Sequence, residues 1–239
     1  MPFLIPSLLI ASGKGGVGKS TVSVNLAIAL SQLGLKVGLL DADMYGPSIP
    51  VMLGLTRTQS PTEPVEKFGI KIMSVGFFLQ EGQAGLWRGP ILHGLLEKLL
   101  ASPWGDLDLL VVDLPPGTGD VPISLSKLLS EKKGIIVTTP QEVALQDARR
   151  ALQAFEILQI PTAGIIENMS GFVFGKGGGS LLAERYGIDF LGNIPFLSSL
   201  QYGADEGKPA AFYKGSEGAH LPYEQLAKTL LKTLKRNDQ

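Results

Sequence analysis

The sequence predicts an α/β fold in which a mostly parallel sheet is flanked by helices on both faces. Short, continuously apolar runs alternate along the chain with amphipathic stretches of helical period. This is the pattern of strands that are buried on both faces and connected by helices. A glycine-rich segment follows the first apolar run and opens the first helix. In a sheet of this kind, ligands bind at the carboxyl ends of the strands.

The elements are expected in a regular order along the chain. The first strand contains the apolar run Leu8–Ile10, and the first helix is expected over residues 22–33. Further strands are expected at residues 36–40, 70–75, 107–112, 134–138, 162–166 and 190–191, and further helices at 91–100, 143–160 and 179–186. The polar, proline-bearing stretch 56–66 has no periodic pattern and is predicted to be a mobile loop.

The size and composition fit a single domain over residues 1–239. The chain is 44% hydrophobic and has a formal net charge of -1, so it has no general attraction to nucleic acid. No apolar run approaches the roughly 20 residues of a membrane-spanning helix, and no basic residue precedes the first apolar stretch. We therefore expect a cytoplasmic protein that binds no nucleic acid. The complete absence of cysteine excludes thiolate ligands from this chain.

Residues 13–21, GKGGVGKST, form the most informative motif of the sequence. They satisfy the phosphate-loop pattern G-x-x-x-x-G-K-[ST] and lie between a predicted strand and a predicted helix, as that motif requires. Glycines let successive backbone N–H groups face phosphate oxygens, Lys19 reaches the β and γ phosphates, and the Ser20 hydroxyl ligates Mg²⁺. The expected ligands are ATP and Mg²⁺. The expected nucleotide-binding residues are Gly13, Gly15, Gly16, Val17, Gly18, Lys19, Ser20 and Thr21.

Three aspartates that follow predicted strands complete a set of residues for phosphoryl transfer. Asp41 and Asp43 follow the second strand, and Asp113 follows the apolar run LLVV. We expect Asp41 to position or deprotonate the attacking water, and Asp43 and Asp113 to join Ser20 in the magnesium shell. The alternative role for Asp41 and Asp43 is turn and helix capping.

The segment after Asp113 is expected to report the γ phosphate. Gly117 and Gly119 allow backbone N–H groups to approach that phosphate, and Asp120 is expected to close the loop. A loop that touches only the γ phosphate converts hydrolysis into a conformational signal.

A second lysine, Lys14, lies near the start of the phosphate loop. It is expected to point away from its own phosphates and to reach the nucleotide of a second subunit, like an arginine finger. ATP would then hold a homodimer together, and the catalytic residues would be Lys14, Lys19 and Asp41. A small-molecule kinase is the other class considered, but a kinase has no need of such a lysine.

These motifs resemble those of the Mrp-type iron-sulfur cluster carriers, P-loop ATPases with a deviant Walker A motif that are related to septum-positioning and plasmid-partitioning ATPases. The matching stretches are SGKGGVGKST, LLDADMYGPSIPVMLGL, WRGP at residues 87–90, VVDLPPGTGD, VTTPQEVALQDARR, IIENMSGF and GNIPF. The resemblance implies a homodimer with ATP at the interface, and adenine contacts from Asn168 and from the backbone around Pro195. It also implies a role in iron-sulfur or metalloprotein assembly, with a scaffold or target protein as partner.

The sequence departs from this family in two places. Many relatives carry an additional N-terminal domain, whereas this sequence begins at the first strand. The family's C-x-x-C lies shortly after ENMS, but here residues 168–173 run directly into Phe174 and a glycine-rich stretch. A cluster held by cysteines of this chain is therefore not available. The alternative function is an ATP-controlled positioning or recruitment switch that acts on a membrane or protein partner.

Other features of the sequence favour structural roles. His93 and His220 have no ligand-like spacing, and the glycine run 175–179 is expected to be a turn rather than an anion cradle. The C-terminal helix has leucines near one face and basic side chains around them. We expect it to dock on its own domain rather than on an anionic membrane. Its leucines are Leu226, Leu230, Leu231 and Leu234, and its basic residues are Lys228, Lys232, Lys235 and Arg236.

Overall fold

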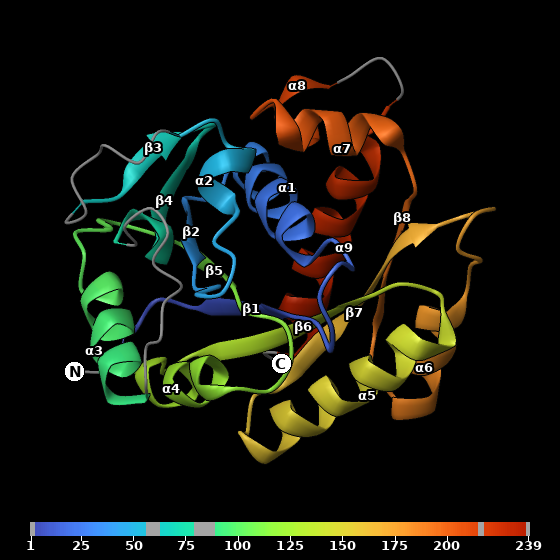
Figure 1. Cartoon of the computed structure of the whole chain (residues 1–239), viewed down its shortest axis with the longest axis horizontal. Helices are drawn as coiled ribbons and strands as arrows, with labels where there is room; N and C mark the ends of the chain where they lie inside the picture. Colours follow the sequence, from blue (N-terminus) through green and yellow to red (C-terminus); the bar gives the residue numbers. More distant parts are fainter. Residues whose placement is uncertain (1–2, 56–62, 79–88, 215–217, 238–239) are drawn as a thin grey trace.

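The structure, a computed structural model, describes residues 3–55, 63–78, 89–214 and 218–237 (Figure 1). Its central element is an eight-stranded sheet with the strand order β3-β4-β2-β5-β1-β6-β7-β8. The strands are β1 (Ser7–Ala11), β2 (Val37–Asp41), β3 (Val65–Lys67), β4 (Ile70–Ser74), β5 (Leu109–Asp113), β6 (Lys132–Thr138), β7 (Thr162–Ser170) and β8 (Phe190–Pro195). Among the strands of the described residues, only the edge strand β3 pairs antiparallel with its neighbour. The predicted α/β fold with a mostly parallel sheet is confirmed.

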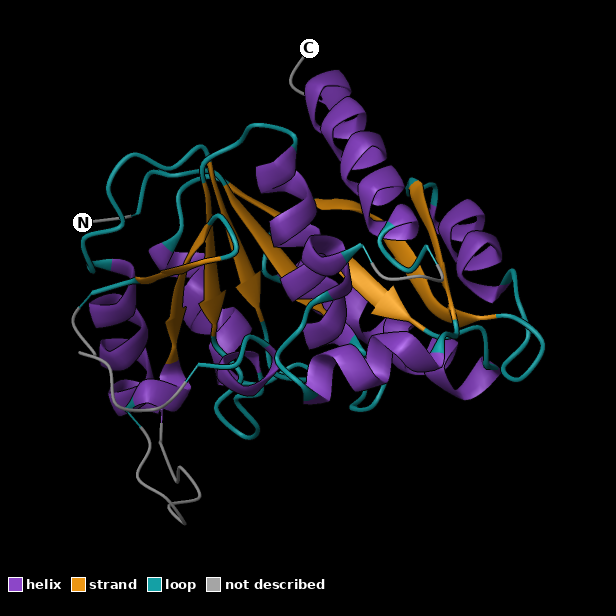
Figure 2. Cartoon of the chain, turned by 90° about the horizontal axis from the view of Figure 1, so that it is seen from above, coloured by secondary structure: helices purple, strands orange, loops and turns teal. Residues whose placement is uncertain are grey.

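Helices cover both faces of the sheet, and most strand arrowheads point toward the same edge in Figure 2. One face carries α1 (Lys19–Gln32), α2 (Ile49–Met52), α8 (Ala210–Tyr213) and α9 (Leu221–Asn237), with α7 (Ser198–Asp205) beside α2 and α8. The other face carries α3 (Gly89–Leu100), α4 (Asp120–Leu128), α5 (Glu142–Ile157) and α6 (Gly178–Tyr186). A 3-10 turn, η1 (Val75–Phe77), follows β4.

The central strands are continuously apolar because each of their residues packs against one of two helix layers. In β1, Leu8 and Ile10 join the apolar cluster that includes residues of α1 and α9, whereas Leu9 joins the cluster that includes residues of α3, α4, α5 and α6. Successive strand residues point to opposite faces, so a strand covered on both sides needs apolar residues throughout. All residues of β1, β2 and β5 are buried as a result.

The structure corrects several predicted bounds. The strand expected at 162–166 continues to Ser170, and the strand expected at 190–191 continues to Pro195. The loop predicted over 56–66 is wrong at its end, because β3 begins at Val65. Residues 56–62 of that loop, and the tryptophan and arginine of WRGP, lie outside the described residues.

The C-terminal helix α9 docks on the body of the protein, as predicted. Leu226 and Leu230 are at most 2% exposed, and Leu231 and Leu234 pack at the edge of the same cluster. Within the described ranges, no helix is long and apolar enough to cross a membrane.

Candidate functional site

The phosphate loop connects the carboxyl end of β1 to α1, and two of its glycines are required by its shape. Gly18 has a φ of 79°, and a Cβ on it would lie 2.2 Å from the Asn168 amide of β7. A Cβ on Gly13 would lie 2.0 Å from the backbone of Asp147 in α5. Glycine therefore allows both the left-handed turn and the close approach of two neighbouring elements.

The loop borders a cavity of about 230 Å³. The opposite wall comes from the segment between β2 and α2, which contributes Asp43, Gly46 and Ser48, from Met52 of α2, and from Pro116 after β5. Because β1, β2 and β5 are neighbouring parallel strands, their carboxyl ends bring these residues to one place. The loop residues on the wall are Ser12, Lys14, Gly15, Gly16, Val17, Gly18, Lys19, Ser20 and Thr21.

Asp113 lies completely buried behind the phosphate loop and holds it in place. Its carboxylate accepts hydrogen bonds of 2.6 Å from the hydroxyls of Ser20 and Ser23. The Lys19 ammonium lies 2.9 Å from the same carboxylate. Asp113 does not line the cavity. It therefore acts through Ser20, whose hydroxyl hydrogen is directed to Asp113. The Ser20 oxygen also accepts a hydrogen bond of 3.2 Å from the Lys19 ammonium, which leaves one lone pair for a ligand.

Asp43 is the carboxylate that faces the cavity. It lies on the cavity wall, 3.7 Å from the Lys19 ammonium. Its Oδ1 accepts hydrogen bonds of 3.2 Å from the backbone N–H groups of Tyr45 and Gly46, which fix its direction. Burial raises the pKa of Asp43, and the charge of Lys19 opposes that shift.

Asp41, expected to handle the attacking water, is fully buried and is absent from the cavity wall. Its Oδ2 accepts a hydrogen bond of 2.8 Å from the Ser74 hydroxyl of β4, and its Oδ1 accepts one of 3.1 Å from the Asp43 backbone. Burial, together with the neighbouring charge of Asp113, raises the pKa of Asp41 to about 8. The geometry favours Asp43 over Asp41 as the group beside a reacting water, because only Asp43 has access to the cavity.

The oxygen atoms on the cavity wall fit a magnesium ion that is held mainly by a nucleotide. Ser20 and Asp43 contribute a hydroxyl and a carboxylate, the hard oxygen ligands that Mg²⁺ prefers. Over the described residues, no group of three or more His, Cys, Asp or Glu side chains is arranged to hold a metal by itself. This matches the usual magnesium site of phosphoryl-transfer enzymes, which relies on phosphates and water for its other ligands.

The loop after β5 is connected directly to the phosphate loop. The Gly117 N–H donates a hydrogen bond of 2.9 Å to the Ser12 carbonyl, and the Ser12 hydroxyl donates one of the same length to the Lys14 carbonyl. Asp120, expected to close this loop, is instead the first residue of α4, with Gly119 as N-cap. Lys14 is half-buried and borders the cavity of its own chain. That it points away from its own phosphates therefore stays a prediction.

A second cavity, of about 300 Å³, adjoins the first and has mostly apolar walls with a few polar groups. The two cavities share Gly18, Thr21 and Met52. Walls of this kind are typical of small-molecule pockets. Its remaining lining residues are Asn168, Met169, Pro195, Phe196, Leu197, Leu200, Gln201, Ala204 and Asp205. Asn168 and Pro195 were expected here, whereas sequence reasoning missed the contribution of α7.

Asn168 also contacts the phosphate loop itself. Its side-chain amide donates a hydrogen bond of 2.8 Å to the Val17 carbonyl, and the residue is 5% exposed. The amide oxygen is not used in this bond and remains as an acceptor on the wall of the second cavity.

The glycine run after β7 is closed by the protein's own carboxylate. Glu167 is fully buried and accepts hydrogen bonds from the backbone N–H groups of Gly177 (3.0 Å) and Gly179 (2.7 Å) and from the Ser170 hydroxyl (2.8 Å). This occupies the start of α6, so the run is a structural turn, as expected.

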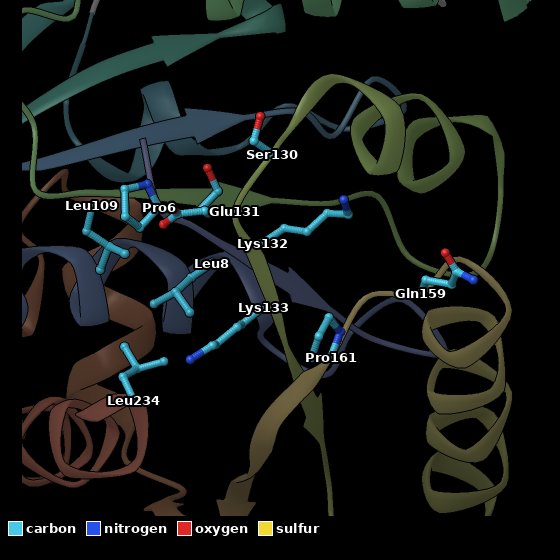
Figure 3. Close-up of a pocket in the computed structure, with 11 residues that line it drawn as sticks. Pro6, Leu8, Leu109, Ser130, Glu131, Lys132, Lys133, Gln159, Pro161 and Leu234 are labelled. Carbon is cyan, nitrogen blue, oxygen red and sulfur yellow. The ribbon is translucent and has the colours of Figure 1, made fainter. Parts of the chain in front are cut away.

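A larger cavity, of about 610 Å³, lies at the amino ends of β1 and β6, away from the phosphate loop (Figure 3). The side chains of Lys132 and Lys133 point in opposite directions there, as neighbours on a strand do. Lys132 donates a hydrogen bond of 3.0 Å to the Leu129 carbonyl. The basic side chains do not converge, so size alone does not make this cavity a functional site.

Comparison with known proteins decides the family. Residues 6–231 match the family of the NUBPL iron-transfer P-loop NTPases. The chain belongs to this family. It is 42% identical to the Arabidopsis thaliana "iron-sulfur protein required for NADH dehydrogenase, mitochondrial" in an alignment that covers 95% of this chain and 78% of that protein. It is 45% identical to the iron-sulfur cluster carrier protein of Aquifex aeolicus, over 93% of this chain and 66% of that relative, slightly less than two thirds of its length.

Solved structures agree with this assignment. The nucleotide-binding protein of Archaeoglobus fulgidus, in complex with ADP, is 37% identical, with a TM-score of 0.72 over 86% of this chain and 87% of that chain. The septum site-determining protein MinD of Pyrococcus horikoshii, complexed with Mg-ADP, has a TM-score of 0.80 over 96% of this chain and 97% of that chain. At 23% identity the MinD comparison shows the fold alone. The resemblance to Mrp-type carriers is therefore confirmed.

Proposed function

We propose that the protein is an ATP-binding and ATP-hydrolysing dimeric switch that acts in iron-sulfur or metalloprotein assembly. The observation that carries this proposal is the phosphate cavity, where the loop with Lys14 and Lys19 meets Ser20 and Asp43. Membership of the iron-sulfur carrier family supports the assembly role.

The catalytic proposal assigns one role to each group of the site. The N–H groups of the phosphate loop and the Lys19 ammonium bind the phosphates, and Asp113 orients the Ser20 hydroxyl toward the metal. Asp43 orients the attacking water from the cavity wall. Mg²⁺, when bound, neutralises charge on the phosphates, and Ser20 and Asp43 would hold it directly or through water. Asp41 holds the Asp43 backbone in place by accepting a hydrogen bond from the Asp43 N–H.

A second copy of this chain is proposed to cover the nucleotide face. Apolar side chains are exposed on segments that follow the carboxyl ends of β2, β6 and β7, around the phosphate cavity. Large exposed apolar groups of this kind mark protein interfaces. They are Tyr45 (82% exposed), Val51 (64%), Val143 (66%), Phe172 (106%) and Val173 (67%). Lys14 lies at the same face, where it would act on the nucleotide of the other subunit.

The iron-sulfur role is proposed without a cluster bound by this chain. The sequence has no cysteine, so thiolates for a cluster would come from a scaffold or target protein. The same absence favours a second candidate function, an ATP-controlled recruitment switch that acts on a membrane or protein partner and carries no metal.

Two measurements test the enzymatic proposal. Phosphate release and binding of ATP with Mg²⁺ should be compared for the wild type, Asp43→Asn and Asp41→Asn. We expect Asp43→Asn to bind ATP but to lose most turnover, roughly 100-fold or more, as when an oriented catalytic group is removed. Asp41→Asn should retain more of the turnover because it does not face the cavity. The assignment is wrong if Asp43→Asn hydrolyses ATP at the wild-type rate.

The two candidate functions can be distinguished by identifying the partners that bind the protein only in its ATP-bound state. Asp43→Asn protein held in ATP should be used to capture partners from native extract, with nucleotide-free protein as the control. Cysteine-rich scaffolds or iron-sulfur enzymes that bind only in ATP would support the assembly role. If membranes or partners without metal bind only in ATP instead, the result would support the recruitment switch.

A further inference from the structure

We infer that the Ser48 hydroxyl donates a hydrogen bond to a phosphate oxygen of the bound nucleotide. This inference rests on the proposed nucleotide-binding function. It adds to the site a side chain from the wall opposite the phosphate loop, in the segment between β2 and α2.

The Ser48 hydroxyl is available to a ligand. Ser48 is half-buried, lies on the wall of the phosphate cavity and is the N-cap of α2, yet its side chain makes no capping hydrogen bond. A capping serine accepts from the N–H groups of the second and third helical residues. Here the second helical residue is Pro50, which has no N–H. One of the two usual partners is thus missing from the sequence, and the N–H of the third helical residue, Val51, does not bond to this hydroxyl.

The backbone that carries Ser48 is held in place from both sides. On the side of β2, Asp43 accepts hydrogen bonds from the Tyr45 and Gly46 N–H groups. On the side of β4, the Pro47 ring packs so closely on Gly76 that a Cβ added there would lie 2.9 Å from the Pro47 Cβ. A hydroxyl on a fixed backbone loses little conformational freedom when a ligand binds.

The position of Ser48 along α2 indicates which part of the nucleotide it meets. Met52, one turn further on, borders both cavities, whereas Ser48 lines only the phosphate cavity. Ser48 therefore lies at the phosphate end of α2. A hydroxyl can donate one hydrogen bond, and bonds to ionised oxygens are the strong ones.

Binding of a fluorescent, non-hydrolysable ATP analogue to the full chain tests this inference. Ser48→Ala should weaken binding by roughly 10- to 100-fold, the range for a hydrogen bond to a charged group. Ser48→Thr keeps the hydroxyl and should bind within about threefold of the wild type, by the same reasoning. The matched control is Ser126→Ala, since the Ser126 hydroxyl bonds only to the Ile123 carbonyl of its own helix, and its affinity should not change.

The assay is repeated in EDTA to distinguish a phosphate contact from a metal ligand. A loss in Ser48→Ala that is present both with and without Mg²⁺ supports the phosphate contact. A loss that appears only with Mg²⁺ overturns it in favour of metal ligation, and equal affinity of Ser48→Ala and wild type overturns it completely. If the wild type itself binds no nucleotide, the proposed function fails first. Circular dichroism melting confirms that each variant is folded.

Discussion

Two glycine-rich turns in this protein have similar sequences, but one borders an open cavity and the other is bonded to a carboxylate of the protein itself. The phosphate loop before α1 and the run before α6 each connect a parallel strand to a helix and direct backbone N–H groups inward. The residues of the first turn border a cavity with Lys19 on its wall. At the second turn the N–H groups of Gly177 and Gly179 are occupied by the buried Glu167 carboxylate.

The difference teaches that glycine spacing makes N–H groups available but does not decide what binds them. A helix start attracts an anion, and that anion can be a phosphate or a carboxylate of the same chain. At the second turn, the internal carboxylate lies on β7 immediately before Asn168. At the first turn, the cavity and its lysines remain for a ligand.

The second turn lies where the resemblance to the Mrp-type carriers implies a C-x-x-C, and this chain has no cysteine. The chain closes there with two backbone hydrogen bonds between Gly171 and Gly175, of 2.7 and 2.8 Å. Phe174 packs edge-on against Phe196, with ring centroids 5.3 Å apart, and Phe196 lines the second cavity. The segment between Gly171 and Gly175 is therefore a short closed turn that packs on the wall of the second cavity.

The largest expected effect comes from exchanging the lysine of each turn for alanine. Lys19→Ala should weaken ATP binding by roughly 100-fold or more, because the charge that meets the β and γ phosphates is lost. Lys176→Ala, an exposed lysine in the second turn, should leave the affinity unchanged. Isothermal titration calorimetry of both variants measures this. Tight ATP binding by Lys19→Ala would remove the distinction between the two turns.

Glu167→Gln tests whether the second turn depends on its own carboxylate. The amide cannot accept hydrogen bonds at both ends, so at least one of the buried donors loses its partner. The free energy of unfolding should fall by about 1–3 kcal/mol, measured by urea denaturation. ATP affinity should change little, since Glu167 lines neither the phosphate cavity nor the second cavity. An unchanged urea midpoint would show that the carboxylate does not hold the turn.

Lys14→Ala tests whether the first turn also serves a second copy of the chain. ATP-dependent dimerisation should weaken by about tenfold, equivalent to 1.4 kcal/mol, because one charge contact to the neighbour's nucleotide is lost at each site. Light scattering over a range of protein concentrations measures the dissociation of the dimer. The matched control is Lys235→Ala, an exposed lysine of α9 at the opposite end of the sheet from the phosphate loop. If the dimer of Lys14→Ala is as stable as that of the wild type, the lysine is not used between subunits.

The last predicted effect is a pH dependence of the protein's stability that comes from Asp41, the buried carboxyl next to the phosphate loop. The pKa of Asp41 is raised from 3.8 to about 8 in the folded protein, whereas the unfolded chain ionises near the ordinary value. Unfolding therefore releases a proton between about pH 4 and pH 8, and the contribution of this group lowers stability as the pH rises through that window. Asp41→Asn removes the titration.

Melting temperatures in EDTA without nucleotide provide the measurement for Asp41. The melting temperature of Asp41→Asn minus that of the wild type should increase from pH 5 to pH 8.5. The control is Asp106→Asn, because Lys36 lowers the pKa of the exposed Asp106 and this carboxyl does not titrate in that range. A difference for Asp41→Asn that stays constant over the same range would contradict the raised pKa.

The central part of the fold could be predicted from local patterns, and its edges could not. The strands β1, β2 and β5 are buried on both faces, so their apolar runs are unbroken. The edge strand β3 has only intermediate and exposed residues, and α7 has no buried residue. Elements that bury little leave a weak periodic signal.

For the aspartates, the sequence indicates that Asp41 and Asp43 lie at one strand end, but it does not indicate which of them faces the cavity. Asp41 and Asp43 are two positions apart at a strand end, and nothing local distinguishes them. Their environments differ because Ser74, on the neighbouring strand β4, binds Asp41 inside the protein, whereas Asp43 is directed to the cavity. That contact joins residues 33 positions apart.

The sequence by itself determined the fold class, the family, the phosphate loop and the absence of thiolate ligands, because each depends on residue types at fixed local spacing. Only the tertiary structure decided which carboxylate faces the phosphate cavity, that Glu167 bonds to the second glycine turn, and that α7 lines the second cavity. These outcomes depend on which strands are neighbours in the sheet. The order of the strands sets the burial and the hydrogen-bond partners of each residue. No single segment of the sequence contains that order.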